Sequence, residues 1–371
     1  MEQKYIEAYE RGLRKVRHLD RNLDAFPHAT RDGVWLTNKE GHWTGGFWTG
    51  LIWLEYLHSG EQAVAARARD WALRLQSRIS DNKTHDQGFI FGPSCYFGYN
   101  LTGDKAFLPL IHAGARNMIG LHNPHTGLIL AWDEPGYEGV AIVDTAMNVP
   151  LIWLSGLLDG DMERQDLART LMANIRTHHI RPDFTTFHVA RWDKEYRITG
   201  DTHQGFAPES CWSRGLAWAI YGFANMYRHT GEETWLETSL KMAEYFFSHL
   251  NDNGLPAWDF VFRNDKEQPI DAAAGSIAAA GAMLTAWLLN RKGDPTGEAR
   301  SLARGKAMLD ALIDTCLYTD IERYGIIEKV IIDLPRKSGI GESTMYGDYY
   351  FMEALYRLHN LDNDEKLELL Y

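Results

Sequence analysis

Two aspartates in the sequence have surroundings that suit acid–base chemistry. Asp86 lies in the run T-H-D-Q-G-F and Asp144 in the run I-V-D-T-A-M-N, and each precedes a stretch compatible with a helix. Two carboxylates in one low-dielectric pocket separate their pKa values, so that one holds a proton near neutral pH while the other stays charged. General acid–base catalysis on a glycoside requires such a pair. The alternative for Asp144 is a structural one, in which its carboxylate caps the helix that follows.

Other polar and aromatic residues gather in the long loops of the chain. The candidates are His42, Trp43, His85, Trp132, His188, His203, Gln204, Arg214, Trp258, Asp271, Glu342, Ser343 and Tyr346. Ionisable side chains are rarely buried without partners, so few of these are expected in the core. The chain has no G-x-S-x-G, H-E-x-x-H, Walker A or G-x-G-x-x-G motif. His85, His188 and His203 would bind a metal only if the fold brought them together, and we expect neither a metal nor a cofactor.

One unit recurs along the chain and predicts how these loops are positioned. An aromatic helix is followed by a turn of the type Tyr-x-x-Ser/Thr-Gly-Asp/Glu and then by an amphipathic helix. The turns are centred on Gly60, Gly103, Gly160, Gly231 and Gly293, and a degenerate sixth copy from Tyr356 to Asp362 ends the chain. Glycine in the left-handed region followed by an acid is typical of a helix end and a helix start. The intervals of 43 to 71 residues are too long and uneven for a 34-residue helical array.

The two helices of each unit differ in composition. The second helices, at 62–79, 104–121 and 232–250, place apolar residues at helical spacing with charges between them. The first helices, at 46–53, 211–218 and 272–281, carry small or aromatic residues almost all round, as buried helices do. We therefore predict an all-α fold, a single (α/α)6-barrel domain over residues 1–371 with inner and outer helix rings. An open solenoid would not need inner helices that are apolar on every face.

Composition narrows the classes of partner. The chain has 371 residues, 38 basic and 50 acidic residues, and a formal net charge of −12, which argues against nucleic acid and anionic membranes. Thirteen tryptophans suit an aromatic-lined cavity. The three cysteines form no zinc or disulfide pattern. The N-terminal residues show no apolar signal region and no run of 18 apolar residues occurs, so we expect a cytoplasmic protein that is a monomer or weak homodimer.

Six motifs in unbroken order between about residues 41 and 358 resemble those of glycoside hydrolase family 88, the unsaturated glucuronyl hydrolases. They are H-W-T-G-G-F-W-T-G, T-H-D-Q-G-F, V-D-T-A-M-N, T-H-Q-G-F, E-S-C-W-S-R-G-L-A-W-A-I-Y-G-F and E-S-T-M-Y-G-D-Y-Y-F-M-E-A-L. The family fold is an (α/α)6 barrel. The resemblance implies a hydrolase of disaccharides left by polysaccharide lyases, which carry a 4,5-unsaturated uronic acid at the non-reducing end.

The resemblance also implies residue roles. The enol-ether double bond is protonated at C4, water adds at C5, and the resulting hemiketal opens and releases the remaining sugar. Asp144 matches the family's proton donor, and Asp86 matches the second essential carboxylate, which orients sugar hydroxyls and raises the pKa of its neighbour. The matching substrate-binding positions are Trp43, His85, Trp132, His188, His203, Gln204, Trp212, Arg214 and Trp218. Arg214 is the natural candidate to help hold an anionic group.

Three alternatives remain at this point. An unsaturated rhamnogalacturonyl hydrolase shares the barrel and the chemistry but acts on pectin fragments. A sugar epimerase on the same architecture would rely on paired histidines, and replacing Asp144 by Asn would leave it substantial activity. A non-catalytic helical scaffold would have a polar groove and no sealed pocket, which the tryptophans and loop acids disfavour.

Overall fold

Six helical segments pack side by side into a closed inner ring. In the computed structural model, which describes residues 2–371, each segment packs against the next and the last packs against the first. In ring order the segments are α2 (Gly45–Ser59), α4 (Gln87–Phe91) with η2 (Gly92–Tyr96) and α5 (Phe97–Thr102), α7 (Thr145–Asn148) with α8 (Pro150–Asp159), α10 (Ser213–Thr230), α12 (Ala272–Lys292), and α14 (Met345–His359). The predicted closed barrel is confirmed, and an open solenoid is excluded because α14 packs against α2.

Five outer helices follow the inner segments as the repeat predicted. They are α3 (Gln62–Arg74), α6 (Leu108–Gly120), α9 (Met162–His179), α11 (Glu233–Ser248) and α13 (Pro295–Thr315). The five repeat glycines sit between the two helices of each hairpin with φ between +66° and +77°. This left-handed conformation ends a helix cheaply only where the residue has no Cβ.

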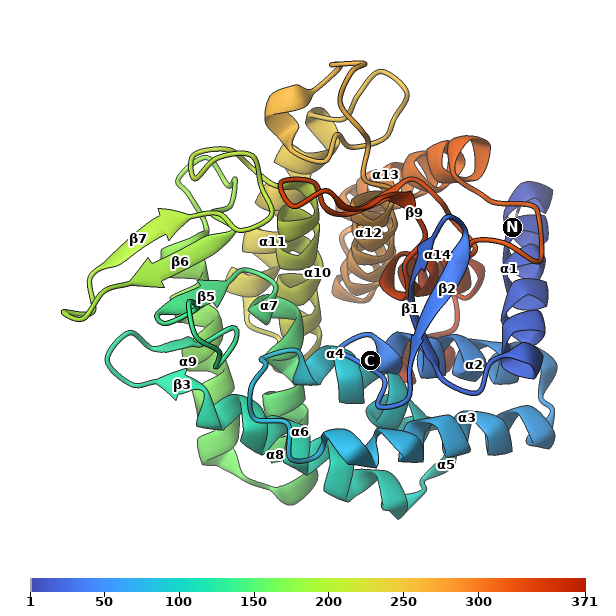
Figure 1. The fold of residues 1–371 in the computed structure, drawn as a ribbon, viewed down its shortest axis with the longest axis horizontal. Coiled ribbons are helices and arrows are strands. Elements are labelled where there is room, and N and C mark those ends of the chain that lie inside the picture. The colour runs from blue at the N-terminus through green and yellow to red at the C-terminus, as the bar shows by residue number, and fades with distance from the viewer. Residues whose placement is uncertain (1) are drawn as a thin grey trace.

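The sixth hairpin is built differently from the prediction. After α14 the chain forms only the short helix α15 (Asp364–Glu368), and Asn360 has φ −117° in place of a left-handed glycine. The outer position is taken by α1 (Gln3–Asn22), which packs against α14 and α2 and lies next to α14 at the right of Figure 1. The Tyr5 hydroxyl of α1 also donates to Asp310 Oδ1 of α13 at 2.7 Å. The N-terminal helix therefore completes the outer ring.

Burial explains the composition of the inner helices. Every residue of α12 from Ala272 to Leu289 is buried, as is every residue of α2 from Gly45 to Glu55. By length and composition alone α12 could cross a membrane, but its apolar window is wholly buried inside the barrel. Its hydrophobicity therefore reflects its place among α10, α13 and α14.

The long loops hold short antiparallel strands that were not predicted. The strands are β1 (Phe26–Arg31) paired with β2 (Val34–Asn38), β3 (His122–Asn123) with β4 (Leu128–Ile129), the three-stranded sheet β5 (Val140–Ile142), β6 (Val189–Trp192) and β7 (Ile198–Asp201), and β8 (Val330–Asp333) with β9 (Ser338–Glu342). The 3-10 turns η1 (Leu75–Arg78), η3 (Lys105–Phe107) and η4 (Phe260–Phe262) complete the connections. In β5–β6 the register pairs Val140 with Arg191 and Ile142 with Val189, so this sheet joins two loops that are far apart in sequence.

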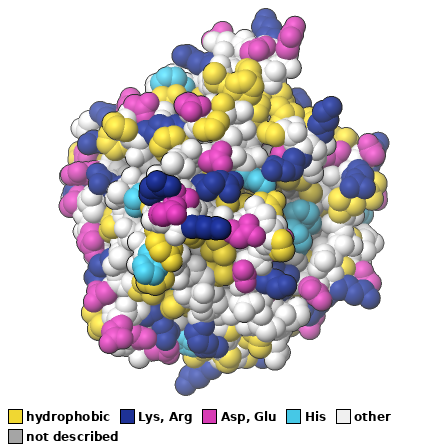
Figure 2. All heavy atoms as spheres, turned by 60° about the vertical axis from the view of Figure 1, so that its left-hand side comes forward, with side chains coloured by type: hydrophobic (Ala, Val, Ile, Leu, Met, Phe, Trp, Pro, Cys, Tyr) yellow, Lys and Arg dark blue, Asp and Glu magenta, His cyan; other side chains and the backbone are white. Residues whose placement is uncertain are grey.

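The β6–β7 hairpin projects from the barrel at the left of Figure 1, and Figure 2 brings this side forward. Basic and acidic side chains lie next to one another on the face shown in Figure 2. On the hairpin, Arg191 pairs with Asp201 at 2.9 Å and Arg197 pairs with Asp193 at 2.7 Å. The charges of these two arginines are therefore locally neutralised.

Candidate active site

Asp144 stands between a strand and the start of an inner helix. It follows β5 and Val143 and occupies the position before α7, but its side chain makes no capping hydrogen bond and its backbone is already helical (φ −55°, ψ −24°). The Val143 amide donates to the His188 carbonyl at 2.9 Å, which extends the β5–β6 pairing up to the carboxylate. The capping alternative for Asp144 is therefore wrong, and its side chain is free for another role.

The environment of Asp144 favours the protonated carboxyl group. The residue is buried, and its Oδ2 atom has no hydrogen-bond partner among the described residues. Burial raises the pKa of Asp144 to about 7; the Arg214 guanidinium opposes this shift, and the negative charge of Asp86 adds to it. Near neutral pH the site thus holds a carboxylic acid whose proton is not committed to a hydrogen bond within the protein.

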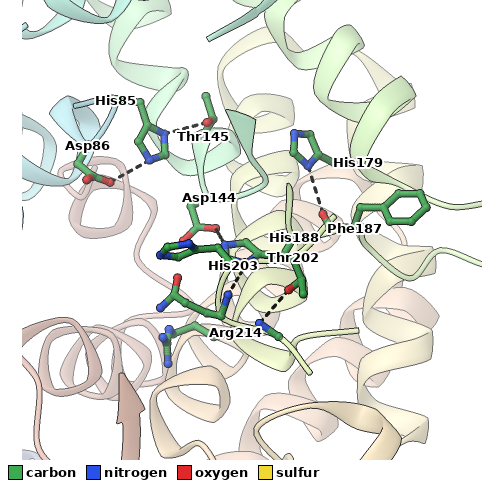
Figure 3. A network of polar contacts seen from close by, with 12 residues as sticks. His85, Asp86, Asp144, Thr145, His179, Phe187, His188, Thr202, His203 and Arg214 are labelled. Atoms are coloured by element: carbon green, nitrogen blue, oxygen red, sulfur yellow. Dashed lines mark hydrogen bonds and ion pairs between the residues drawn. The ribbon is translucent and has the colours of Figure 1, made fainter. Parts of the chain in front are cut away.

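His188 lies behind Asp144 and is held in one tautomer. Its Nδ1 accepts hydrogen bonds from the backbone amides of His203 and Gln204, both at 3.1 Å. Because Nδ1 accepts two hydrogen bonds, the ring proton resides on Nε2, which lies 3.8 Å from Asp144 Oδ2 (Figure 3). Burial lowers the pKa of His188 well below its usual range, so the ring is neutral. It can donate to the Asp144 carboxylate when that group loses its proton.

A chain of polar contacts connects the two acids. Asp86 Oδ2 accepts from the Thr84 hydroxyl at 2.7 Å, and Asp86 Oδ1 lies 3.3 Å from His85 Nε2. The other ring nitrogen of His85, Nδ1, lies 2.8 Å from the hydroxyl of Thr145, the residue after Asp144 (Figure 3). The fully buried His85 ring therefore ties the Asp86 loop to the start of α7 and fixes the relative position of the two carboxylates.

Arg214 is buried and extensively bound. Its Nη1 donates to Asp271 Oδ2 at 2.5 Å and to the Ile331 carbonyl, and its Nη2 donates to the Ile332 carbonyl at 2.7 Å. The guanidinium carbon lies 4.5 Å from the centre of the Trp212 ring. Asp271 neutralises much of the Arg214 charge that was expected to bind an anion. The Nε–H group and one Nη2–H group of Arg214 take no part in these hydrogen bonds. The side chain therefore both holds β8 in place and faces the cavity.

The β8–β9 hairpin is attached to the site by further donors. The Gln204 side-chain amide donates to the Ile332 carbonyl at 2.7 Å. Arg336, in the turn of the hairpin, donates through Nη1 to the His203 carbonyl at 2.8 Å and lies with Nη2 2.9 Å from His203 Nδ1. The hairpin thus forms a fixed wall of the site, against the loop that carries His203 and Gln204.

These residues surround a cavity of about 250 Å³ at the end of the barrel where the inner helices begin. The lining residues are His28, His42, Trp43, Asp86, Phe89, Trp132, Ile142, Asp144, His203, Gln204, Trp212, Arg214, Trp218, Ile332, Asp333 and Tyr346. Trp43 is stacked on Tyr346 with ring centres 5.2 Å apart and an angle of 23° between the rings. Flat aromatic faces next to two carboxylic groups suit a sugar ring.

The structure brings together nearly all of the residues predicted from the sequence. Trp43, Trp132, His203, Gln204, Trp212, Arg214 and Trp218 line the cavity together with Asp86 and Asp144. His85 and His188 differ from the expectation, because both are buried behind the acids and neither lines the cavity. We interpret these two histidines as positioning residues.

Some cavity residues were not among the sequence candidates. Phe89 is one of them, although it lies in the quoted motif T-H-D-Q-G-F, which could have revealed it, whereas the candidates His42 and Tyr346 do line the cavity. His28 had no local signal, because only the β1–β2 hairpin brings it to the cavity. Conversely, Asp271 and Glu342 serve structure: Asp271 caps α12, and Glu342 accepts from the Thr30 hydroxyl at 2.6 Å.

A larger cavity, of about 430 Å³, lies far from this site. Its lining includes Tyr227, Arg228, His229 and Gly231 at the end of α10. Arg214 is at the start of that helix, roughly 20 Å away at 1.5 Å per residue. Its cations are largely engaged: Arg291 pairs with Glu368, and Arg228 donates to three backbone carbonyls. It holds no carboxylate pair and is not the candidate active site.

A closed α/α barrel whose cavity combines aromatic faces with two carboxyl groups is typical of enzymes that act on carbohydrates. The sequence profile of Glycosyl Hydrolase Family 88 matches residues 18–252. The unsaturated glucuronyl hydrolase of Bacillus sp. (strain GL1) is 31% identical, with 92% of this chain and 93% of that protein covered. The unsaturated chondroitin disaccharide hydrolase of Streptococcus pneumoniae (strain ATCC BAA-255 / R6) is 29% identical, with 93% and 90% covered.

Solved structures agree with the sequence comparison. The crystal structure of an unsaturated glucuronyl hydrolase specific for heparin superposes with a TM-score of 0.90 at 26% identity, and the match covers 100% of both chains. The unsaturated glucuronyl hydrolase from Bacillus sp. GL1 gives a TM-score of 0.88 at 30% identity over 96% of this chain and 97% of that one. The chain belongs to Glycosyl Hydrolase Family 88. It is a glycoside hydrolase and acts on a carbohydrate substrate.

Proposed function

We propose that this enzyme is an unsaturated glucuronyl hydrolase that acts on glycosaminoglycan disaccharides. It hydrates the C4=C5 double bond of the 4,5-unsaturated glucuronic acid at the non-reducing end and so releases the second sugar. The observation that carries the proposal is the Asp144 carboxyl group, which is buried, has a pKa of about 7 and keeps Oδ2 unpartnered beside the cavity. The names of the relatives support the same substrate class.

The proposed reaction needs a group that first gives and then takes a proton. Asp144 gives its proton to C4 of the enol ether, and the positive charge that develops at C5 is captured by water. The ionised Asp144 accepts a proton from that water, so the acid is regenerated while the C5–O bond forms. The hemiketal then opens and the second sugar leaves. The His188 Nε2–H, 3.8 Å from Asp144 Oδ2, is placed to stabilise the carboxylate between the two transfers.

Other residues of the cavity have supporting roles in this proposal. Asp86 orients sugar hydroxyls, and its negative charge helps to keep Asp144 protonated. The stacked pair Trp43 and Tyr346 supplies an apolar face for the ring. The free N–H groups of Arg214 are available to the uronate carboxylate, whose charge would otherwise meet two acids.

The test follows the ultraviolet absorbance of the conjugated double bond with unsulfated and sulfated unsaturated chondroitin and hyaluronan disaccharides. We expect the absorbance to fall as free amino sugar is released, and in D₂O one deuterium to appear at C4 of the product. Proton transfer by the enzyme should place this deuterium on one face of C4, whereas direct hydrolysis at the anomeric carbon would release an enol that takes up deuterium on both faces of C4 in solution and would contradict the proposal. Decay only with unsaturated galacturonyl-rhamnose would move the enzyme to the pectin substrates.

Variants test the roles of the acids. Asp144→Asn should lower kcat by at least about 100-fold, the usual scale for loss of a general acid. Asp70→Asn, at an exposed position on α3, serves as the matched control and should retain full activity. Wild-type turnover in Asp144→Asn would contradict the assignment of Asp144 as the proton donor.

A further inference from the structure

Three aspartates stand directly before inner helices. They are Asp86 before α4, Asp144 before α7 and Asp271 before α12. An aspartate at this position usually accepts a hydrogen bond from the second or third amide of its helix. Asp271 does so, from Ala273 at 3.1 Å and from Ala274 at 3.4 Å. Asp86 and Asp144 make no capping hydrogen bond, and these are the two that line the cavity.

The Asp86 carboxylate is directed away from its own helix. Its Oδ2 accepts from the Thr84 hydroxyl at 2.7 Å, and its Oδ1 lies 3.3 Å from His85 Nε2 (Figure 3). A cap by Asp86 would bind the amide of Phe89, the third residue of α4. The first amides of a helix have no acceptor within the helix, so the buried Phe89 amide needs an acceptor from elsewhere.

Asn148 supplies this acceptor from the neighbouring helix. It is the last residue of α7 and is fully buried. Its Oδ1 accepts from the Phe89 amide at 2.9 Å, and its Nδ2 donates to the backbone carbonyl of Asp144 at 3.2 Å. One side chain therefore joins the helix that follows Asp86 to the backbone of Asp144.

The two helices can approach each other this closely because Gly88 has no side chain. A Cβ at Gly88 would lie 2.5 Å from the Cα of Asn148 and 2.9 Å from its Oδ1, closer than packed atoms allow. The helices α4 and α7 also pack directly against each other. The distance between them is thus set by contact with bare backbone, and Asn148 reaches the Phe89 amide across it.

We propose that Asn148 is a positioning residue for Asp86, because it caps α4 in place of Asp86 and leaves the Asp86 carboxylate free to face the cavity. Without the Asn148 side chain, the Phe89 amide is left to Asp86, which belongs to the residue types that cap helices best. The carboxylate then turns from the cavity to its own helix. The inference rests on the proposed function, in which Asp86 orients the sugar.

The first test measures capping without using activity. Asn148→Leu keeps a side chain of similar size but removes both hydrogen bonds. Asp86→Ala removes no cap from the wild-type protein, but it does remove one from Asn148→Leu. We therefore expect Asp86→Ala to lower the urea midpoint by more in the Asn148→Leu background than in the wild-type background. An equal effect in both backgrounds would overturn the assignment.

A matched control separates capping from general destabilisation. Gly98, in α5 of the same inner segment, is buried, and a Cβ there would lie 2.7 Å from Trp53 Cζ2. Gly98→Ala should lower the urea midpoint, but Asp86→Ala should have the same effect in its background as in wild type. If Asn148→Leu does not fold, Asn148→Ala removes the same two hydrogen bonds without adding bulk and serves in the same comparison.

The second test uses turnover of the unsulfated unsaturated chondroitin disaccharide. Asn148→Leu should lower kcat/KM by about tenfold or more, because Asp86 is no longer in place. Asp86→Asn should then cost less in the Asn148→Leu background than in wild type, whereas fully independent losses would show that Asn148 only supports the fold. If the wild-type enzyme leaves the double bond intact, the proposed function fails, and the unfolding comparison still decides whether Asn148 caps α4 for Asp86.

Discussion

Replacing Asp144 by Asn should make the protein more stable at high pH while removing its activity. Burial raises the pKa of this carboxyl group from 3.8 to about 7 in the folded protein. Because the folded-state pKa lies above the unfolded value, the folded protein binds the extra proton, and stability is lost as the pH rises from about 4 through about 7. Each pKa unit corresponds to about 1.4 kcal/mol, so ionising Asp144 costs about 4 kcal/mol above pH 7.

Asparagine does not ionise, so it removes this cost. At pH 5 Asp144 is ionised in the unfolded chain but protonated in the folded protein. Wild type has then lost about 1.7 kcal/mol of stability relative to a residue that does not titrate. At pH 8 the cost approaches its full value. The difference in free energy of unfolding between Asp144→Asn and wild type should therefore grow by about 2.5 kcal/mol from pH 5 to pH 8.

The assay is urea unfolding followed by tryptophan fluorescence at several pH values, for wild type, Asp144→Asn and the exposed control Asp70→Asn. Only Asp144→Asn should show the widening gap, together with the loss of turnover. If the difference in free energy of unfolding between Asp144→Asn and wild type is the same at pH 5 and pH 8, the inference that Asp144 is buried and protonated in the folded enzyme is refuted.

Three further predictions concern the groups around this acid. The wild-type kcat should decline above about pH 7 as Asp144 loses its proton. Asp86→Asn should move this decline to lower pH, because the Asp86 charge raises the pKa of Asp144. A decline at the same pH in the pH–rate profiles of both proteins would contradict the influence of Asp86 on Asp144. His188→Ala should cost about 1–3 kcal/mol in urea unfolding and lower kcat, because it leaves two backbone amides without an acceptor; unchanged stability would show that water replaces the ring. Arg214→Met should lower the free energy of unfolding by about 3–5 kcal/mol, because it leaves Asp271 charged and buried. Adding Asp271→Asn should recover most of that loss. A double variant that is no more stable than Arg214→Met in thermal unfolding would contradict this account.

The helical architecture could be predicted because its signals are local. Each repeat glycine ends a helix through its own φ, and the apolar periodicity on either side distinguishes inner from outer helices. The sixth hairpin could not be predicted in this way, since its outer helix α1 lies at the opposite end of the sequence from α14. The strands were missed because they are only two to six residues long, and β5 in addition depends on pairing with β6, which is far away in sequence.

The candidate site shows the same division. Asp86 and Asp144 stand in recognisable motifs, and the structure places both at one cavity. The roles of His85 and Arg214 depend on partners far away in sequence, Thr145 and Asp271, which no spacing rule connects to them. Motifs thus predicted which residues gather, but not which of them face the substrate and which hold the others.

The closure of the outer ring by α1 has a consequence for the nascent chain. The helix α1 leaves the ribosome before its partner α14, which begins about 320 residues later. At roughly 5–20 residues per second, its apolar face has no permanent partner on that side for about 15 s to a minute of translation. The residues that must wait include Tyr5, Leu13 and Val16, all of which are buried in the finished barrel. Closure of the outer ring at α1 therefore has to wait until the segment that carries α14 has been synthesised.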